Sequence, residues 1–219
     1  MSRLSWPERS VLPVAVPGLK FIVSAAFVTG LFFFMGWGAG AVISLALTLF
    51  ICWFFRDPDR DVPDQSGCVV SPADGKVIVA QKVETSEFID SPSMKISIFM
   101  NIFNVHVNRI PFSGSVESIS YIPGKFVNAS FDKASEHNER NALIIITESG
   151  QRYGVVQIAG LIARRIMCGV GTGDRVLRGS RYGMISFGSR LDIYLPLDAR
   201  LAVSVGDHVR AGSSIIGFM

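Results

Sequence analysis

Hydrophobic and polar residues divide this chain into two contrasting parts. Residues 21–55 contain no charged side chain, so this stretch is apolar on every face. One helix of this length would rise about 50 Å, well beyond the roughly 30 Å hydrocarbon core of a bilayer. The glycine-rich segment MGWGAGA at 35–41 offers a break. The pattern therefore predicts a helical hairpin with two apolar arms of about 15 residues each.

The flanks of this hairpin are basic. Lys20 precedes it, with Arg3 and Arg9 further upstream, and Arg56 and Arg60 follow it. Such flanks predict a hairpin in the cell membrane whose two ends share the cytoplasmic face. Arms of this length are short for two full spans, and a re-entrant or tilted pair fits equally well. A hairpin buried inside protein is the less favoured alternative, because a chain of this size could hardly cover so long an uncharged stretch.

From residue 57 onward the pattern changes to short apolar runs. A polar, proline-rich linker, RDPDRDVPDQSG at 56–67, leads into runs that end at Gly, Pro or polar turn residues. No convincing long amphipathic helix follows the hairpin. We predict a membrane-associated hairpin at 1–56 and a β-rich domain at 57–219. The fold class is mainly β, barrel-sandwich-like, with short antiparallel strands and few helices.

Composition excludes several classes of protein. The three cysteines have no C-x-x-C spacing, so neither a disulfide framework nor a zinc site is predicted. The net charge of +3 is too small to support nucleic-acid binding. A slight basic excess beside an apolar hairpin fits an anionic lipid surface instead.

Few residues carry obvious chemistry. Of the three histidines, only His106 lies in a run that is otherwise apolar at alternate positions. Asp74 occupies an Ala-Asp-Gly turn, and the pair Arg164 and Arg165 interrupts the apolar GLIARRIM. A paired Arg in such a segment must find anions or solvent. Ser189 follows Gly188, but Gly-Ser pairs also occur at 114–115, 179–180 and 212–213. Each signal is weak alone.

Together these segments resemble a known family. FFRDPDR, SPADGKV, NVHVNRIPFSG, NER, GLIARRI, RGSRYGMISFGSRLDIYLP and GDHVRAG follow one another over residues 54–217. The ordered series, with a membrane hairpin in front, is similar to the phosphatidylserine decarboxylase proenzymes of the short, bacterial and archaeal-type branch.

The resemblance implies a self-processing enzyme. Such a chain cuts itself between Gly188 and Ser189 into a large chain, 1–188, and a small chain, 189–219, which stay associated. Ser189 becomes a covalent pyruvoyl cofactor, and no metal is needed. The pyruvoyl carbonyl forms a Schiff base with phosphatidylserine, which loses CO2 to give phosphatidylethanolamine. The implied partners are the phospholipid and the bilayer, and a homo-oligomer is compatible with the sequence.

The resemblance also assigns roles to residues. Asp74 matches the acidic member of the self-cleavage relay, and His106 matches its histidine. Longer bacterial relatives carry a second histidine three residues later, where this chain has Arg109. Either His106 serves as both cleavage base and later proton donor, or cleavage runs without a dedicated base. Arg109, Arg164 and Arg165 are candidates to bind the substrate's phosphate or carboxylate.

Three alternatives remain open. The sequence SMKIS at 93–97 is similar to a biotin-carrier lysine motif, so a membrane-tethered lipoyl- or biotinyl-like carrier or adaptor is one. Lys95, however, lies in a strand-like run rather than at a hairpin tip. A hydrolase triad of Ser189, His106 and Asp74 is the second, although no G-x-S-x-G motif supports it. A non-enzymatic membrane scaffold is the third.

Overall fold

The computed structural model describes residues 13–124, 138–160, 166–185 and 188–219. Two compact units make up the chain, Arg9–Asp59 and Arg60–Met219, and each is described by itself. The predicted domain boundary at 56–57 remains a prediction.

The first unit is the predicted helical hairpin. A short 3-10 turn, η1 (Val16–Gly18), leads into α1 (Leu19–Phe34), and α2 (Gly38–Phe54) returns after a tight turn. The helices have 16 and 17 residues, close to the predicted arm length. A hydrogen bond of 3.0 Å joins the hydroxyls of Thr29 and Thr48 between them. At the base, the Ala15 amide donates to the Phe55 carbonyl at 2.8 Å and closes the hairpin.

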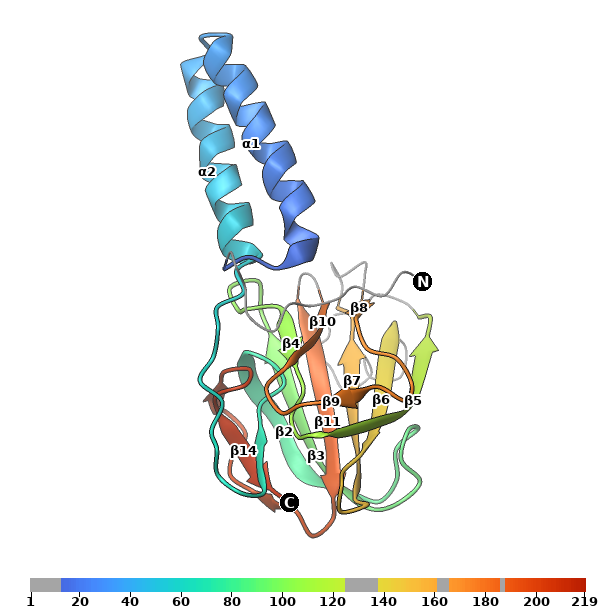
Figure 1. The fold of residues 1–219 in the computed structure, drawn as a ribbon. Coiled ribbons are helices and arrows are strands. Elements are labelled where there is room, and N and C mark those ends of the chain that lie inside the picture. The colour runs from blue at the N-terminus through green and yellow to red at the C-terminus, as the bar shows by residue number, and fades with distance from the viewer. Residues whose placement is uncertain (1–12, 125–137, 161–165, 186–187) are drawn as a thin grey trace. The chain divides into compact units, whose positions relative to one another are not determined.

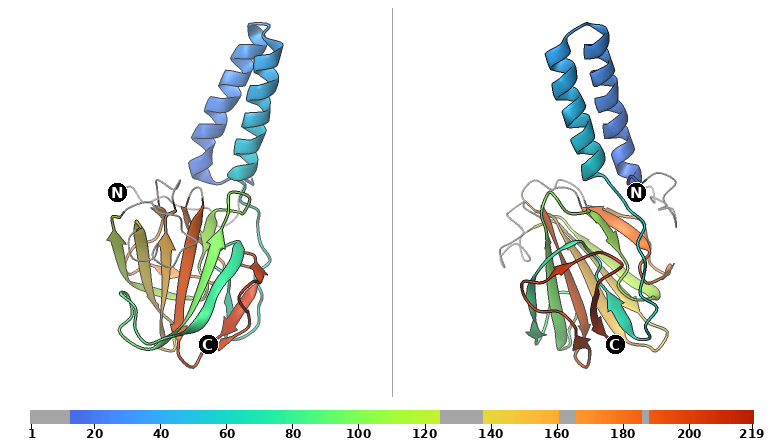
Figure 2. Two further views of the ribbon diagram at one scale, coloured as in Figure 1. Left: turned by 180° about the vertical axis from the view of Figure 1, so that it is seen from behind. Right: turned by 90° about the vertical axis from the view of Figure 1, so that its left-hand side faces the viewer.

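The second unit is built almost entirely of strands, which Figures 1 and 2 show as a curled antiparallel sheet with smaller sheets beside it. The large sheet has eight strands in the order β13-β2-β3-β11-β7-β6-β5-β9, and the two smaller sheets have the orders β1-β14-β12 and β4-β10-β8. The strands are β1 (Cys68–Val70), β2 (Gly75–Val83), β3 (Ser93–Met100), β4 (Val107–Arg109), β5 (Gly114–Ile122), β6 (Arg140–Ile146), β7 (Arg152–Ile158), β8 (Ile166–Cys168), β9 (Arg175–Val176), β10 (Arg181–Ile185), β11 (Ser189–Pro196), β12 (Arg200–Leu201), β13 (His208–Val209) and β14 (Ile215–Phe218). The predicted fold class, mainly β with an N-terminal helical hairpin, is confirmed.

Strand β11 lies in the interior of the large sheet. It pairs with β3 along its whole length and with β7 over residues 190–194. Because side chains alternate between the faces of a strand, Leu191, Ile193 and Leu195 point together into the main hydrophobic core. The residues between them point to the other face of the sheet. This strand therefore links the two buried layers of the unit.

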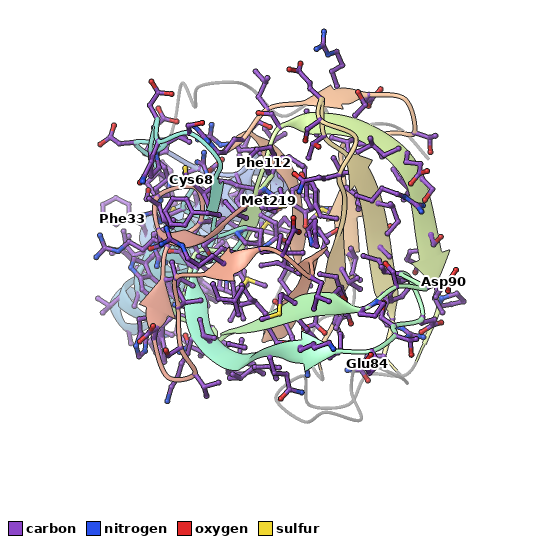
Figure 3. The ribbon with its side chains drawn as sticks, turned by 90° about the horizontal axis from the view of Figure 1, so that it is seen from below. Phe33, Cys68, Glu84, Asp90, Phe112 and Met219 are labelled. Carbon is purple, nitrogen blue, oxygen red and sulfur yellow. The ribbon has the colours of Figure 1, made fainter. Side chains whose placement is uncertain are left out.

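The C-terminus is fixed to the beginning of the β unit. β14 pairs with β1, where Phe218 lies opposite Cys68, and the Met219 amide donates to the Gly67 carbonyl at 2.9 Å. The Met219 side chain packs against the main core, as does Phe112, and Figure 3 shows both near Cys68. The end of the chain is thus held by main-chain bonds and by apolar contacts.

Tyr182 on β10 is fully buried in the main core. Its hydroxyl has no hydrogen-bond partner among the described residues. Burial raises the pKa of this phenol well above its usual value, and the neighbouring Cys168 and Tyr153 raise it further. A phenol held neutral in the folded state ionises near pH 10 in the unfolded chain, so folding loses stability as the pH rises above 10.

We predict that Tyr182→Phe is at least as stable as the wild type at pH 7, because it removes a buried hydroxyl without a partner. Above pH 10 the free energy of unfolding of this variant should fall with pH less steeply than that of the wild type. The two slopes should differ by about 1.4 kcal/mol per pH unit. Urea unfolding of the full chain in detergent at pH 7, 10 and 11 measures both effects. Tyr121→Phe, at a half-exposed phenol, is the control and should change the slope much less. Destabilisation at pH 7 would contradict the prediction.

Candidate active site

Ser189 is the first residue of the interior strand β11, and its side chain is fully buried. It lies opposite Met100 of β3, and its hydroxyl faces the Met100 sulfur at 3.9 Å. Gly188 directly before it has a φ of +59°, in the left-handed region that favours glycine. A bend of the backbone thus immediately precedes a buried, weakly bonded hydroxyl.

The other three Gly-Ser pairs offer different surroundings. Ser115 is exposed, and Ser180 and Ser213 are partly exposed. Gly179 also has a positive φ, but the Ser180 hydroxyl donates to the Leu177 carbonyl at 2.6 Å within a turn. Among the four pairs, Ser189 alone combines full burial with a hydroxyl whose one contact within the described part of the chain is a weak acceptor.

His106 and Asn108 are fully buried at the beginning of β4. Asn108 Nδ2 lies 3.7 Å from the Met100 sulfur that Ser189 also contacts. The predicted histidine is therefore two residues along the chain from a side chain that shares this sulfur with Ser189. The His106 carbonyl accepts a bond from the Ile185 amide, which joins this segment to β10.

Asp74 directly precedes β2, which pairs with β3 on the edge opposite to β11. Lys76 and Arg190 both pair with Phe99, so Asp74 and Ser189 flank the Met100 end of that strand. Two strand spacings separate them, about 10 Å. The Asp74 carboxylate accepts from Arg60 at 2.9 Å and from the Ala211 amide at 2.7 Å. The carboxylate is thus held in place by two donors and can orient the groups around it.

The predicted arginines separate into two groups. Arg109 is buried, and its guanidinium donates to the Gly179 carbonyl at 2.9 Å. It also packs closely against Gly212, where an added Cβ would lie 2.8 Å from Arg109 Cδ. Alternation turns Arg109 away from the face that carries Asn108. Arg164 and Arg165 lie outside the described residues.

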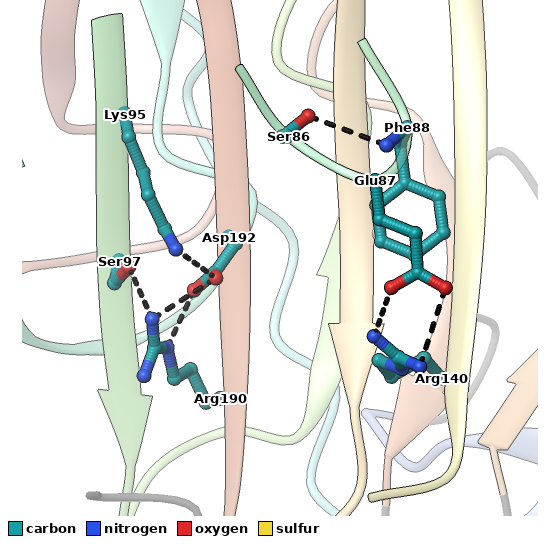
Figure 4. Close-up of polar contacts among 8 residues, drawn as sticks. All are labelled: Ser86, Glu87, Phe88, Lys95, Ser97, Arg140, Arg190 and Asp192. Carbon is teal, nitrogen blue, oxygen red and sulfur yellow. Dashed lines mark hydrogen bonds and ion pairs between the residues drawn. The ribbon is translucent and has the colours of Figure 1, made fainter. Parts of the chain in front are cut away.

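A buried ionic network that was not predicted from the sequence occupies the opposite face of β11 (Figure 4). Arg190 Nε donates to Asp192 at 2.6 Å, and Arg190 also donates to the Ser97 hydroxyl at 3.0 Å. Lys95 lies 3.1 Å from the same carboxylate. The signal in the sequence was the alternation in SRLDIYLP, where two opposite charges share one face of an apolar strand.

Lys95 is a partner in this network. Burial lowers the pKa of Lys95, but the Asp192 carboxylate and Tyr194 together raise it by more and leave the pKa above its usual value. The lysine lies in the interior of β3 rather than at a hairpin tip, so the structure does not favour a carrier lysine at this position.

A second ion pair lies on β6, which is two strands from β11 in the large sheet. Arg140 on β6 pairs with Glu87, which lies in the segment between β2 and β3 (Figure 4). The same segment places Phe88 and Ile89 on a small apolar cluster formed by β6, β7 and β11. This segment, which Glu84 and Asp90 mark in Figure 3, therefore covers the outer face of the sheet.

The described residues contain no group of His, Cys, Asp and Glu side chains that could hold a metal ion. The described groups around Ser189 include the Met100 thioether and the Asn108 amide, and the His106 imidazole lies two residues before Asn108 in the chain. These groups suit proton transfer and hydrogen bonding to a carbonyl.

Comparison with known proteins assigns this chain to a class of lyases that act on phospholipids. The matching family model is that of phosphatidylserine decarboxylase, over residues 47–217. The chain belongs to the phosphatidylserine decarboxylase family, which confirms both the resemblance in its sequence and the predicted class of enzyme.

Several relatives cover nearly the whole chain. A phosphatidylserine decarboxylase proenzyme from Syntrophus aciditrophicus is 50% identical over 93% of this chain and 96% of its own length. One from Desulfotalea psychrophila is 49% identical over 94% of this chain and 96% of its own length. A third, from Ralstonia pickettii, is 52% identical over 78% of this chain and 79% of its own length.

We predict that Asp192→Asn destabilises the fold by about 3–5 kcal/mol, because it leaves the Arg190 cation buried without its carboxylate. Urea unfolding of the full chain in detergent measures the change. Glu148→Gln is the matched control, since it removes the carboxylate of an exposed pair with Arg175 and should cost less than about 1 kcal/mol. Equal losses of unfolding free energy in the two variants would show that the buried network stabilises the fold no more than an exposed ion pair does.

Proposed function

We propose that this chain cuts itself between Gly188 and Ser189 and then converts phosphatidylserine to phosphatidylethanolamine and CO2 with a pyruvoyl group made from Ser189. The observation that carries the proposal is the position of Ser189. It is a buried hydroxyl at the start of an interior strand, directly after a glycine with positive φ. Membership of the decarboxylase family supplies the reaction.

Self-cleavage is a sequence of balanced steps. Ser189 Oγ attacks the Gly188 carbonyl carbon while His106 takes the hydroxyl proton. The bond from Gly188 to the Ser189 nitrogen then breaks, the nitrogen takes a proton, and an ester remains. Loss of the Ser189 α-proton expels the Gly188 carboxylate and leaves dehydroalanine. Water converts this group to pyruvoyl and releases ammonia.

The fold keeps the small chain in place after the cut. β11 stays bonded to β3 and β7, and the Arg190–Asp192 network locks its outer face. Strand β14 holds the other end through β1. The new N-terminus therefore stays at the Met100 end of β3.

The surroundings of Ser189 fit a small carbonyl group. Asn108 offers an amide donor on the same side, whereas the Lys95 amine lies on the opposite face of the sheet, paired with Asp192. A carbonyl at residue 189 is thus kept from this lysine and left for the substrate's amine. When present, the pyruvoyl group supplies the electron sink that lets CO2 leave.

The hairpin suits a substrate that stays in the bilayer. Its outward side chains are large and apolar, including Phe27, Phe33 and Ile43. Val16–Phe34 is long and apolar enough to cross a membrane. At the base, the Arg56 guanidinium lies 4.2 Å from the ring of Trp53, a pairing typical of the membrane–water interface. We propose that the hairpin holds the enzyme at the cytoplasmic face of the cell membrane.

We predict that the purified wild type gives two masses, for residues 1–188 and 189–219, with the smaller lighter by one ammonia than a serine-started peptide. Ser189→Ala should remain one chain, because it has no nucleophile. Denaturing intact-mass spectrometry measures both. Ser180→Ala is the control at another Gly-Ser bond whose glycine has a positive φ, and it should be processed like the wild type. A single intact mass for freshly made, active wild type would overturn the proposal.

We predict that the full chain stays with bacterial membranes during alkaline carbonate extraction. The double variant Phe27→Lys, Ile43→Lys places two charges on the outward face of the hairpin and should move most of the protein to the soluble fraction. Leu177→Lys alters an equally exposed apolar residue of the β unit and should not. Retention of the double variant would contradict anchoring by the hairpin.

A further inference from the structure

A line of buried amide side chains runs across the large sheet to Ser189. Asn141 Nδ2 donates to Gln157 Oε1 at 3.1 Å, and Gln157 Nε2 donates to Asn108 Oδ1 at 2.9 Å. Asn108 Nδ2 then faces the Met100 sulfur at 3.7 Å, next to the Ser189 hydroxyl. We call Asn141, Gln157 and Asn108 the amide relay. All three are buried.

The relay has a direction. Every amide donates toward Ser189, so the aligned dipoles strengthen one another and present an N–H at the end nearest the serine. That last donor, Asn108 Nδ2, contacts only a thioether among the described residues. Sulfur is a weak acceptor, and buried amide donors usually find a stronger one. The end of the relay is therefore ready for an oxygen that gains negative charge.

We propose that Asn108 Nδ2 donates a hydrogen bond to the oxyanion that forms on the Gly188 carbonyl when Ser189 attacks it, and that Gln157 and Asn141 are positioning residues. This rests on the self-cleavage of the proposed function. In this step the Oγ–C bond forms and the carbonyl electron pair moves to oxygen, while the hydroxyl proton goes to the base. Asn108 forms no covalent bond, and its donor stabilises the charge until the C–N bond breaks.

The positioning residues explain why this donor is fixed. Gln157 Nε2 donates a hydrogen bond to Asn108 Oδ1, so the Asn108 amide cannot turn its oxygen toward Ser189 without losing that bond. Gln157 is itself confined, because an added Cβ on Gly183 would lie 2.9 Å from its Nε2. A donor fixed before the reaction needs no reorganisation when charge develops.

The test measures self-cleavage rather than decarboxylation. Proenzyme made by cell-free synthesis is followed by gel and intact mass from pH 5 to 8. Asn108→Leu keeps the shape but has no donor, and should slow cleavage about 100-fold. Asn108→Asp should be equally slow at pH 8, but its deficit relative to the wild type should shrink at acid pH, where the protonated carboxyl regains an O–H donor.

The ratio to the wild type at each pH removes any pH dependence that the variants share with the wild type. A merely structural role would give Asn108→Leu and Asn108→Asp deficits that do not diverge with pH. Asn104→Asp is the matched control, because Asn104 Oδ1 only accepts a bond from the Asn101 amide and a carboxylate can do the same. It should be cleaved like the wild type.

Gln157→Met keeps Asn108 but breaks the relay, and should slow cleavage about 10-fold, which tests the proposal even if the Asn108 variants fail to fold. Thermal melting identifies such failures. Cleavage of folded Asn108→Leu or Gln157→Met at the wild-type rate would overturn the inference. Failure of the wild type to cleave, or cleavage of Ser189→Ala, would overturn the proposed function instead.

Discussion

The pairing of β11 on both of its edges is the constraint on which the rest of this enzyme depends. Under the proposed function the chain breaks immediately before this strand, yet the new end has to remain in place. Hydrogen bonds to β3 on one side and β7 on the other meet that requirement. The bond proposed to break lies outside the ladder, after a glycine bend, so its loss removes no strand pairing.

The two faces of β11 carry different kinds of side chain. The inner face carries Leu191 and Ile193 into the core and directs Ser189 toward Met100. The outer face carries Arg190 and Asp192, whose charges are satisfied by each other and by Lys95 and Ser97. Since a strand alternates its side chains, ionic groups can lie one residue from Ser189 without sharing its surroundings. The amine of Lys95 is thereby separated from the serine that the proposed function makes reactive.

Under the proposed function, the surroundings of Ser189 favour charge that appears only during self-cleavage. The resting hydroxyl and the Asn108 amide both face a thioether, which binds either of them weakly. Strong acceptors in the same positions would stabilise the resting state and raise the barrier. Under the proposed function, a lipid substrate needs an enzyme held at the membrane surface, and the hairpin meets this separate requirement.

Sequence by itself determined the helical hairpin, the mainly β class and the family. An uncharged stretch with one glycine-rich break leaves few alternatives to a hairpin, and ordered motifs such as NVHVNRIPFSG identify the family whatever the fold. Only the tertiary structure decided which buried groups meet. Met100, Asn108 and Gln157 come from three different strands, and no spacing along the chain indicates that they gather beside Ser189. Arg190 and Asp192 were visible as alternating charges, but their partners were not, because partners across a sheet are set by register.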